Sequence, residues 1–200
     1  MAKDLNRIER KLYRLMPENN DEFIAVCDEM MKLKGWAPFF LVTLLIKRKG
    51  VLYDLKHFPV YEKWLDMHAV HWGRCDILCY RVLNPMVEKF PDLYGHLVKW
   101  TASPNTYTRR AAAVSLIRST RSFVVSAGFP KVKRICDLLK KDPHPHVQKG
   151  IGWLLKYAYL KSPKETEVYL RENVKELSRT TFRYALEKMP QELREELMLK

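Results

Sequence analysis

The stretch VQKGIGWLLKYAY, from Val147 to Tyr159, decides how the chain folds. Its spacing predicts an α-helix with two different faces, because residues three and four apart lie on the same side of a helix. One face is apolar and suits burial: Ile151, Leu154, Leu155 and Ala158. The other face carries cations and aromatic rings: Lys149, Trp153, Lys156 and Tyr157. A cation one turn before an indole can meet a phosphate and a sugar together, so this face is a candidate binding surface.

A stretch further upstream follows the same order of residue types. SPNTYTRRAAAVSL, from Ser103, aligns with DPHPHVQKGIGWLL, from Asp142, at an offset of 39 residues. The alignment places Arg110 over Lys149, and each stretch predicts a helix that starts with a cap residue followed by proline. Helix pairs that recur about every 40 residues are typical of HEAT-like arrays. The sequence therefore predicts an all-α, HEAT-like helical-repeat solenoid, with a concave basic groove and a single domain over residues 1–200.

The remaining sequence also favours helices. The upstream stretch predicts a helix over residues 105–118, and apolar residues at helical spacing predict further helices over residues 4–16, 20–34, 39–47, 59–67, 71–82, 92–100, 131–140, 165–175 and 178–188. Pro85 is expected to disrupt the helix that precedes it, and residues 121–129 are interpreted as an apolar linker. No glycine-rich phosphate loop, strand alternation or nucleotide fingerprint occurs in the sequence.

The charge of the chain favours a polyanionic partner. Lysine and arginine number 36 against 23 acidic residues, which gives a net charge of +13 and an isoelectric point near 9.6. Nucleic acid is the first candidate for such an excess, and a generically basic soluble protein is the alternative. The N-terminus has no apolar run like a signal peptide, and the longest apolar stretch, 36–46, is too short to cross a bilayer. We therefore expect an intracellular, cytoplasmic protein that does not enter membranes.

The cysteines show no metal-binding pattern. Cys27, Cys75, Cys79 and Cys136 include no CxxC pair, and no pair of histidines or cysteines at zinc spacing accompanies them. Reduced, buried thiols are the expected state. The sequence predicts neither a metal site nor a cofactor.

A second candidate group pairs an indole with a carboxylate. Trp72 and Asp76 stand at i and i+4 on a predicted helix. In a stacked array they could face one groove together with Arg110, Lys149 and Trp153. A carboxylate beside a sugar stabilises positive charge at the anomeric carbon while a glycosidic bond breaks. The structural alternatives remain open: a salt bridge from Asp76 to Arg74, Arg81 or Arg110, tryptophans in the core, and a solvated face at Arg109 and Arg110.

Four stretches of the chain resemble the AlkD-type DNA glycosylases, the HEAT-like-repeat branch of the DNA alkylation repair enzymes. Trp72-x-x-x-Asp76 resembles the family's tryptophan and catalytic aspartate at that spacing. The segment 107–112, YTRRAA, resembles its Trp-x-Arg-Arg segment, and 147–157, with Ile-Gly-Trp, resembles its most recognisable signature. The stretch 177–186, LSRTTFRYAL, resembles its C-terminal helix.

The resemblance implies excision of cationic N3- or N7-alkylated purines from double-stranded DNA, without flipping the base into a pocket. It implies that Asp76 stabilises an oxocarbenium-like sugar and that Trp72 and Trp153 pack against the deoxyribose of the lesion. It further implies that Arg110 or Arg109 holds a phosphate, on a DNA-binding surface that also includes Lys149, Lys156 and Tyr157. The expected partner is duplex DNA with alkylated bases, bound by a monomer. Two alternatives stay open: a non-catalytic relative that binds branched or distorted DNA, and a protein-interaction scaffold.

Overall fold

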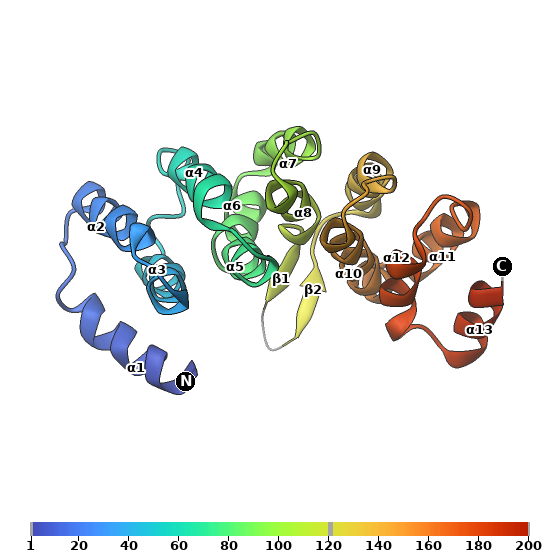
Figure 1. Cartoon of the computed structure of the whole chain (residues 1–200), viewed down its shortest axis with the longest axis horizontal. Coiled ribbons are helices and arrows are strands. Elements are labelled where there is room, and N and C mark those ends of the chain that lie inside the picture. Colours follow the sequence, from blue (N-terminus) through green and yellow to red (C-terminus); the bar gives the residue numbers. More distant parts are fainter. Residues whose placement is uncertain (1, 120–121, 200) are drawn as a thin grey trace.

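The computed structural model describes residues 2–119 and 122–199, which form a helical-repeat solenoid. Its helices stand in two rows that follow one arch (Figure 1). The outer row comprises α2 (Asn20–Lys32), α4 (Phe58–His68), α7 (Tyr94–Trp100), α9 (Phe129–Leu139) and α11 (Pro163–Glu172). The inner row comprises α3 (Trp36–Lys49), α5 (Trp72–Leu78), α8 (Thr106–Val114), α10 (Pro145–Lys161) and α12 (Arg179–Ala185).

Helices of the inner row contact one another in chain order: α3 with α5, α5 with α8, α8 with α10, and α10 with α12. The other helical elements are α1 (Ala2–Tyr13), the π-helical turn η1 (Cys79–Leu83), α6 (Asn84–Lys89), α13 (Gln191–Leu199) and the 3-10 turns η2 (Pro91–Leu93) and η3 (Leu186–Lys188). Helices α1 and α13 lie at the two ends of the arch, on its concave side (Figure 1). The predicted all-α, HEAT-like fold is confirmed.

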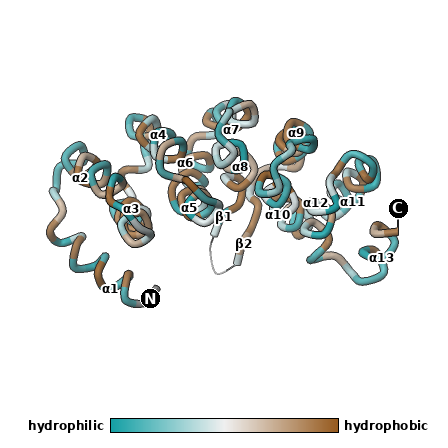
Figure 2. The backbone as a smooth tube through the Cα atoms, viewed as in Figure 1, coloured by the Kyte–Doolittle hydropathy of each residue, from teal (hydrophilic) through white to brown (hydrophobic). Residues whose placement is uncertain are grey.

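The core lies between the two rows. Most buried apolar side chains form one large cluster that extends from Phe23 in α2 to Leu197 in α13, and Trp64, Tyr61 and Tyr169 are its largest fully buried members. A second, smaller cluster comprises Leu5, Phe40, Leu41 and Ile77. Figure 2 shows hydrophobic residues concentrated where the rows face each other, with hydrophilic residues on the outer surface of the arch. Among the described residues, no helix combines the length and the apolar character needed to cross a bilayer.

The starts of α8 and α10 differ from the prediction by two residues. Asn105 and His144 are the N-caps, and their side chains accept the N–H groups of Tyr107 and His146. Ser103 and Asp142, the predicted caps, each accept the N–H of the residue two positions on, at 3.1 and 2.9 Å. They therefore form the turn before each helix. Both caps shift equally, so the offset of 39 residues between the repeats is preserved.

Pro85 disrupts the regular α-helix, as predicted, without ending the helical segment. Helix α5 continues through a π-helical turn, η1 (Cys79–Leu83), into α6. A proline inside a helix removes the hydrogen bond to the carbonyl four residues earlier, which here belongs to Arg81. The hydroxyl of Tyr53 donates to that carbonyl at 2.7 Å instead, and burial raises the pKa of Tyr53 to about 12. The helix therefore passes the proline without leaving this carbonyl unsatisfied.

A small β-hairpin replaces part of the predicted helix and linker. Strand β1 (Ile117–Ser119) pairs antiparallel with β2 (Phe123–Val125), with Ile117 opposite Val125 and Ser119 opposite Phe123. The two strands lie on the concave side of the arch, beside α10 (Figure 1), and β2 is hydrophobic along its length (Figure 2). The prediction of a linker that starts at Arg121 falls partly outside the described residues. From Phe123 to Val125 it is wrong.

Candidate functional site

Helix α5 presents an exposed indole and a buried carboxylate one turn apart. His71 caps the helix by accepting the N–H of Arg74. Trp72, the first residue of the helix, is 55% exposed, whereas Asp76 is 6% exposed. The predicted i, i+4 pair therefore shares one side of α5, with the ring at the surface and the carboxylate beneath it.

Asp76 forms a two-point ion pair with Arg110 of α8. Nε and Nη2 of Arg110 each donate to one carboxylate oxygen of Asp76 at 2.8 Å. Both side chains are almost fully buried, and Nη1 of Arg110 donates to the carbonyl of His146. Burial acts to lower the pKa of Arg110, but the hydrogen bonds and charge of Asp76 outweigh it and raise that pKa. The pair is thus a fixed, preorganised unit.

Arg74 and Arg81, the other two arginines near Asp76 in the sequence, make their contacts elsewhere. Arg74 donates to the carbonyls of Gly35 and His68, and Arg81 donates to Thr43 and lies over the ring of Phe40. Of the three arginines that the sequence offers as salt-bridge partners of Asp76, only Arg110 pairs with it.

Helix α10 contributes the opposite wall of the site. Its predicted apolar face is confirmed, because Ile151, Leu154, Leu155 and Ala158 are all buried. Its other face borders a pocket of about 370 Å³. That pocket is lined by Trp72, Asp76, Arg110, His146, Lys149, Trp153, Lys156, Tyr184 and Glu187. Six residues that the sequence analysis singled out therefore meet at one place.

The Ile-Gly-Trp signature is explained by close packing of two helices. A Cβ atom at Gly152 would lie 2.6 Å from Cβ of Tyr184 and 2.7 Å from the carbonyl oxygen of Thr181. These distances are too short for any side chain, so glycine is required where α10 crosses α12. Gly150 has a related role, since a Cβ there would lie 3.3 Å from Cγ of Arg110. The absence of a side chain at these two glycines lets Arg110 and Tyr184 lie close to α10.

Three residues of the pocket were missed by sequence reasoning: His146, Tyr184 and Glu187. His146 lies in the first turn of α10, Tyr184 comes from α12 and Glu187 from η3. Of these, only Tyr184 falls in the stretch that carries the family resemblance, 177–186. Glu187 accepts a hydrogen bond from Lys156 in an ion pair. The side chain of Lys156 is 15% exposed and that of Glu187 is 44% exposed, so water reaches this pair more readily than the buried Asp76 pair.

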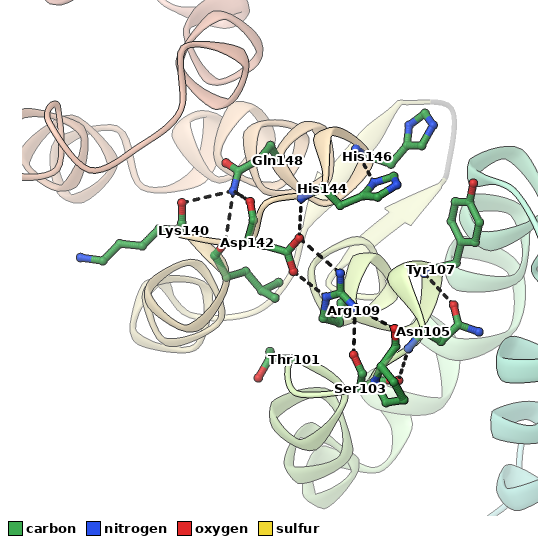
Figure 3. A network of polar contacts seen from close by, with 12 residues as sticks. Thr101, Ser103, Asn105, Tyr107, Arg109, Lys140, Asp142, His144, His146 and Gln148 are labelled. Atoms are coloured by element: carbon green, nitrogen blue, oxygen red, sulfur yellow. Dashed lines mark hydrogen bonds and ion pairs between the residues drawn. The ribbon is translucent and has the colours of Figure 1, made fainter.

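Two predicted site residues lie outside the pocket. Arg109 donates to Asp142 of the next repeat at 2.5 and 3.4 Å, and to the carbonyls of Ser103 and Pro104 (Figure 3). It therefore links two neighbouring repeats. Tyr157 packs against Phe123 and Trp153, with ring centroids 5.5 and 6.4 Å away.

The charges of the pocket are largely paired. Asp76 holds Arg110 and Glu187 holds Lys156, whereas Lys149 has no ion-pair partner within the described part of the chain. Partial burial, followed by the charges of Arg110, His144 and Lys149, lowers the pKa of His146. Lys149 is thus the cation best placed to accept an external anion. In the described ranges, no group of three or more metal-ligating side chains gathers.

The chain is similar to a protein family and to solved structures of other proteins. The model of the DNA alkylation repair enzyme family matches residues 1–189. A predicted DNA alkylation repair enzyme from Enterococcus faecalis superposes with a TM-score of 0.79 at 14% identity, covering 96% of this chain and 87% of that one. AlkD2 from Streptococcus mutans superposes with a TM-score of 0.66 at 19% identity, covering 92% and 88%. A search of curated proteins returns no significant match. At these identities the two structures support the fold alone.

Proposed function

Because the chain belongs to the DNA alkylation repair enzyme family, we propose that it is a glycosylase that excises cationic N3- and N7-alkylated purines from duplex DNA. One observation carries the proposal. A buried carboxylate, Asp76, lies in a pocket that is also lined by two indoles, Trp72 and Trp153, and by three cations. This combination matches the needs of a reaction that creates positive charge on a sugar attached to phosphates.

Asp76 is the proposed catalytic residue. An alkylated purine is already a cationic leaving group, so its departure needs no general acid. When the C1′–N bond breaks, the electron pair goes to the base and neutralises it, and positive charge develops on the deoxyribose. The carboxylate stabilises that charge and orients the water that adds to C1′, which leaves an abasic sugar and a released proton. Arg110 keeps the carboxylate in place.

The indoles are proposed to contact the deoxyribose of the lesion rather than the base. An aromatic face attracts a carbon that carries partial positive charge. The polar side chains of the pocket are mostly charged, and the two carboxylates are already paired. Such a lining suits contacts to the sugar and phosphates more than hydrogen bonds to the edges of a base. This supports excision without flipping of the base. A duplex with one N7-methylguanine tests the activity, since excision leaves an abasic site that alkali cleaves.

Lys149 is the proposed phosphate contact of the pocket. If it neutralises one phosphate, Lys149→Ala should lower the slope of log Kd against log salt by about one. Measurements of duplex affinity between low and moderate salt provide the slope. Lys164→Ala, which removes an exposed cation from α11 in the outer row, is the matched control and should leave the slope unchanged. If the slopes of both variants equal that of the wild type, Lys149 does not contact a phosphate and the phosphate-binding surface lies elsewhere.

Glu187 is expected to oppose DNA binding. Its charge holds Lys156, so a phosphate must displace the carboxylate before it can bind that cation. Glu187→Gln should therefore tighten binding to any duplex several-fold. It should also raise the slope of log Kd against log salt by up to about one, the value for one further phosphate contact. Glu192→Gln makes the same change of charge on α13, outside the pocket, and should have a smaller effect. Similar gains in affinity for both variants would mean that only net charge matters.

A further inference from the structure

The hairpin places one aromatic ring against the wall of the pocket. The ring of Phe123 lies 5.0 Å from that of Trp153, in an edge-to-face arrangement with an interplanar angle of 74°. The same ring lies 5.5 Å from Tyr157 of α10 and 5.9 Å from Tyr80 of η1. Phe123 thus connects α10 of the inner row to η1, which follows α5, through one cluster of four aromatic rings.

Two rings of this cluster pack against Trp153. It is only half-buried, and its ring contacts within the described chain are those with Phe123 and Tyr157. A large side chain at a helix surface populates several rotamers unless neighbouring groups exclude all but one. Tyr157 lies one turn further along the same helix, so Phe123 is the ring partner of Trp153 that comes from another part of the chain.

The hairpin that carries Phe123 is held by contacts to the core, to α10 and to α6. Ile117 and Val125, which face each other in the hairpin, are buried in the core. Lys161 of α10 donates to the carbonyl of Ser126, just after β2. On the other side Glu88 of α6 accepts from the hydroxyl of Ser126 and pairs with Arg118 of β1. The backbone that carries Phe123 is therefore anchored to α6, to α10 and to the core.

We propose that Phe123 is a positioning residue that sets the indole of Trp153 in the orientation needed to contact the deoxyribose. The hairpin is then a part of the site, although it belongs to neither row of helices. The role of the indole in the reaction rests on the proposed function. The coupling of the two rings does not, because it follows from their contact alone.

The ring coupling is tested without DNA. With 5-fluorotryptophan incorporated, the ¹⁹F resonance of Trp153 is assigned by its loss in Trp153→Phe. Phe123→Ala should shift or broaden this resonance, because the indole loses its edge-to-face partner. Val124→Ala, which shortens the next residue of the same strand, should leave it in place. If the alanine variant does not fold, Phe123→Leu replaces it in this experiment, because leucine removes the aromatic ring but keeps an apolar side chain. The same change in the resonance is expected. An unchanged Trp153 resonance in a folded Phe123 variant would overturn the proposal.

A double-mutant cycle connects the coupling to excision. Phe123→Ala should lower the single-turnover excision rate roughly tenfold, since a small misplacement of a positioning group costs about one to two orders of magnitude. In a Trp153→Ala background the same change should cost nothing further. Equal losses in both backgrounds would show that Phe123 does not act through Trp153. If the resonance shifts but no variant, nor the wild type, excises a base, the positioning holds and the proposed glycosylase activity fails.

Discussion

Asp76→Asn should lower the rate of excision by roughly 10²-fold or more, the scale for the loss of one preorganised electrostatic group. Asparagine keeps the shape of the side chain and one carbonyl oxygen, but it lacks the negative charge that stabilises an oxocarbenium-like sugar. The rate is measured in single turnover on a duplex with one N7-methylguanine, at a temperature where the variant is folded. Wild-type excision by a folded Asp76→Asn protein would remove Asp76 from the mechanism.

The buried ion pair complicates this variant, so it needs a matched control. Asp76→Asn leaves the charge of Arg110 without its partner in the interior, which costs on the order of 3–5 kcal/mol when a fully buried pair is broken. Asp142→Asn breaks the pair with Arg109, which also joins two repeats but lies outside the pocket. That variant should be destabilised as well, yet it should excise at the wild-type rate per folded molecule. If both variants lose activity in proportion to their stability, the role of Asp76 is structural.

Gly152→Ala should destabilise the fold by about 1–3 kcal/mol or more, the range for overpacking a closely packed site. The added methyl group would overlap the backbone of Thr181 and Cβ of Tyr184, and backbone atoms cannot turn away as a flexible side chain can. Helix α12 must therefore move from α10. In a domain of this size each kcal/mol lowers the melting temperature by about 2–4 °C.

Gly95→Ala is the control for this substitution. Gly95 is exposed in α7, and no atom lies within 4 Å of the Cβ that alanine would add there. Alanine should leave the stability unchanged or raise it by about 0.5–1 kcal/mol, because it favours a helix over the unfolded chain. Chemical denaturation measures both variants. A Gly152→Ala protein as stable as the wild type would mean that the contact between α10 and α12 is looser than described.

The features that repeat along the chain are predictable from the sequence. The apolar face of α10 follows from helical periodicity, and the 39-residue offset places α8 beside α10 in the inner row. Both depend on spacing alone. The caps were displaced by two residues because Ser103 and Asp142 form a turn first, and a turn and a cap use the same side-chain types.

The hairpin and Pro85 show where local patterns are insufficient. Each strand has only three residues, which is too short for an alternating pattern to stand out from a helix end. The helix passes Pro85 because a hydroxyl from Tyr53, 28 positions from the carbonyl that it satisfies, replaces the missing N–H. No pattern around Pro85 contains that information.

The site is predictable only in part for the same reason. Trp72, Asp76, Arg110, Lys149, Trp153 and Lys156 lie in stretches with a recognisable spacing or family resemblance, and they line one pocket. Tyr184 and Glu187 reach the pocket because α12 packs against Gly152, which is a property of the tertiary structure. Which of the two adjacent arginines lines the pocket also depends on the tertiary structure, since adjacent side chains on a helix point about 100° apart. Arg110 points into the pocket and Arg109 points towards Asp142.

The identity of the product tests the central claim most directly. Purified protein is incubated with methylated duplex DNA, and the free bases are separated and identified by mass spectrometry. We expect release of N7-methylguanine well above the protein-free rate, with abasic sites in equal number and with little release by Asp76→Asn. Tight binding to duplex or branched DNA with no release above the protein-free rate would contradict the claim, and would favour a non-catalytic member of the family.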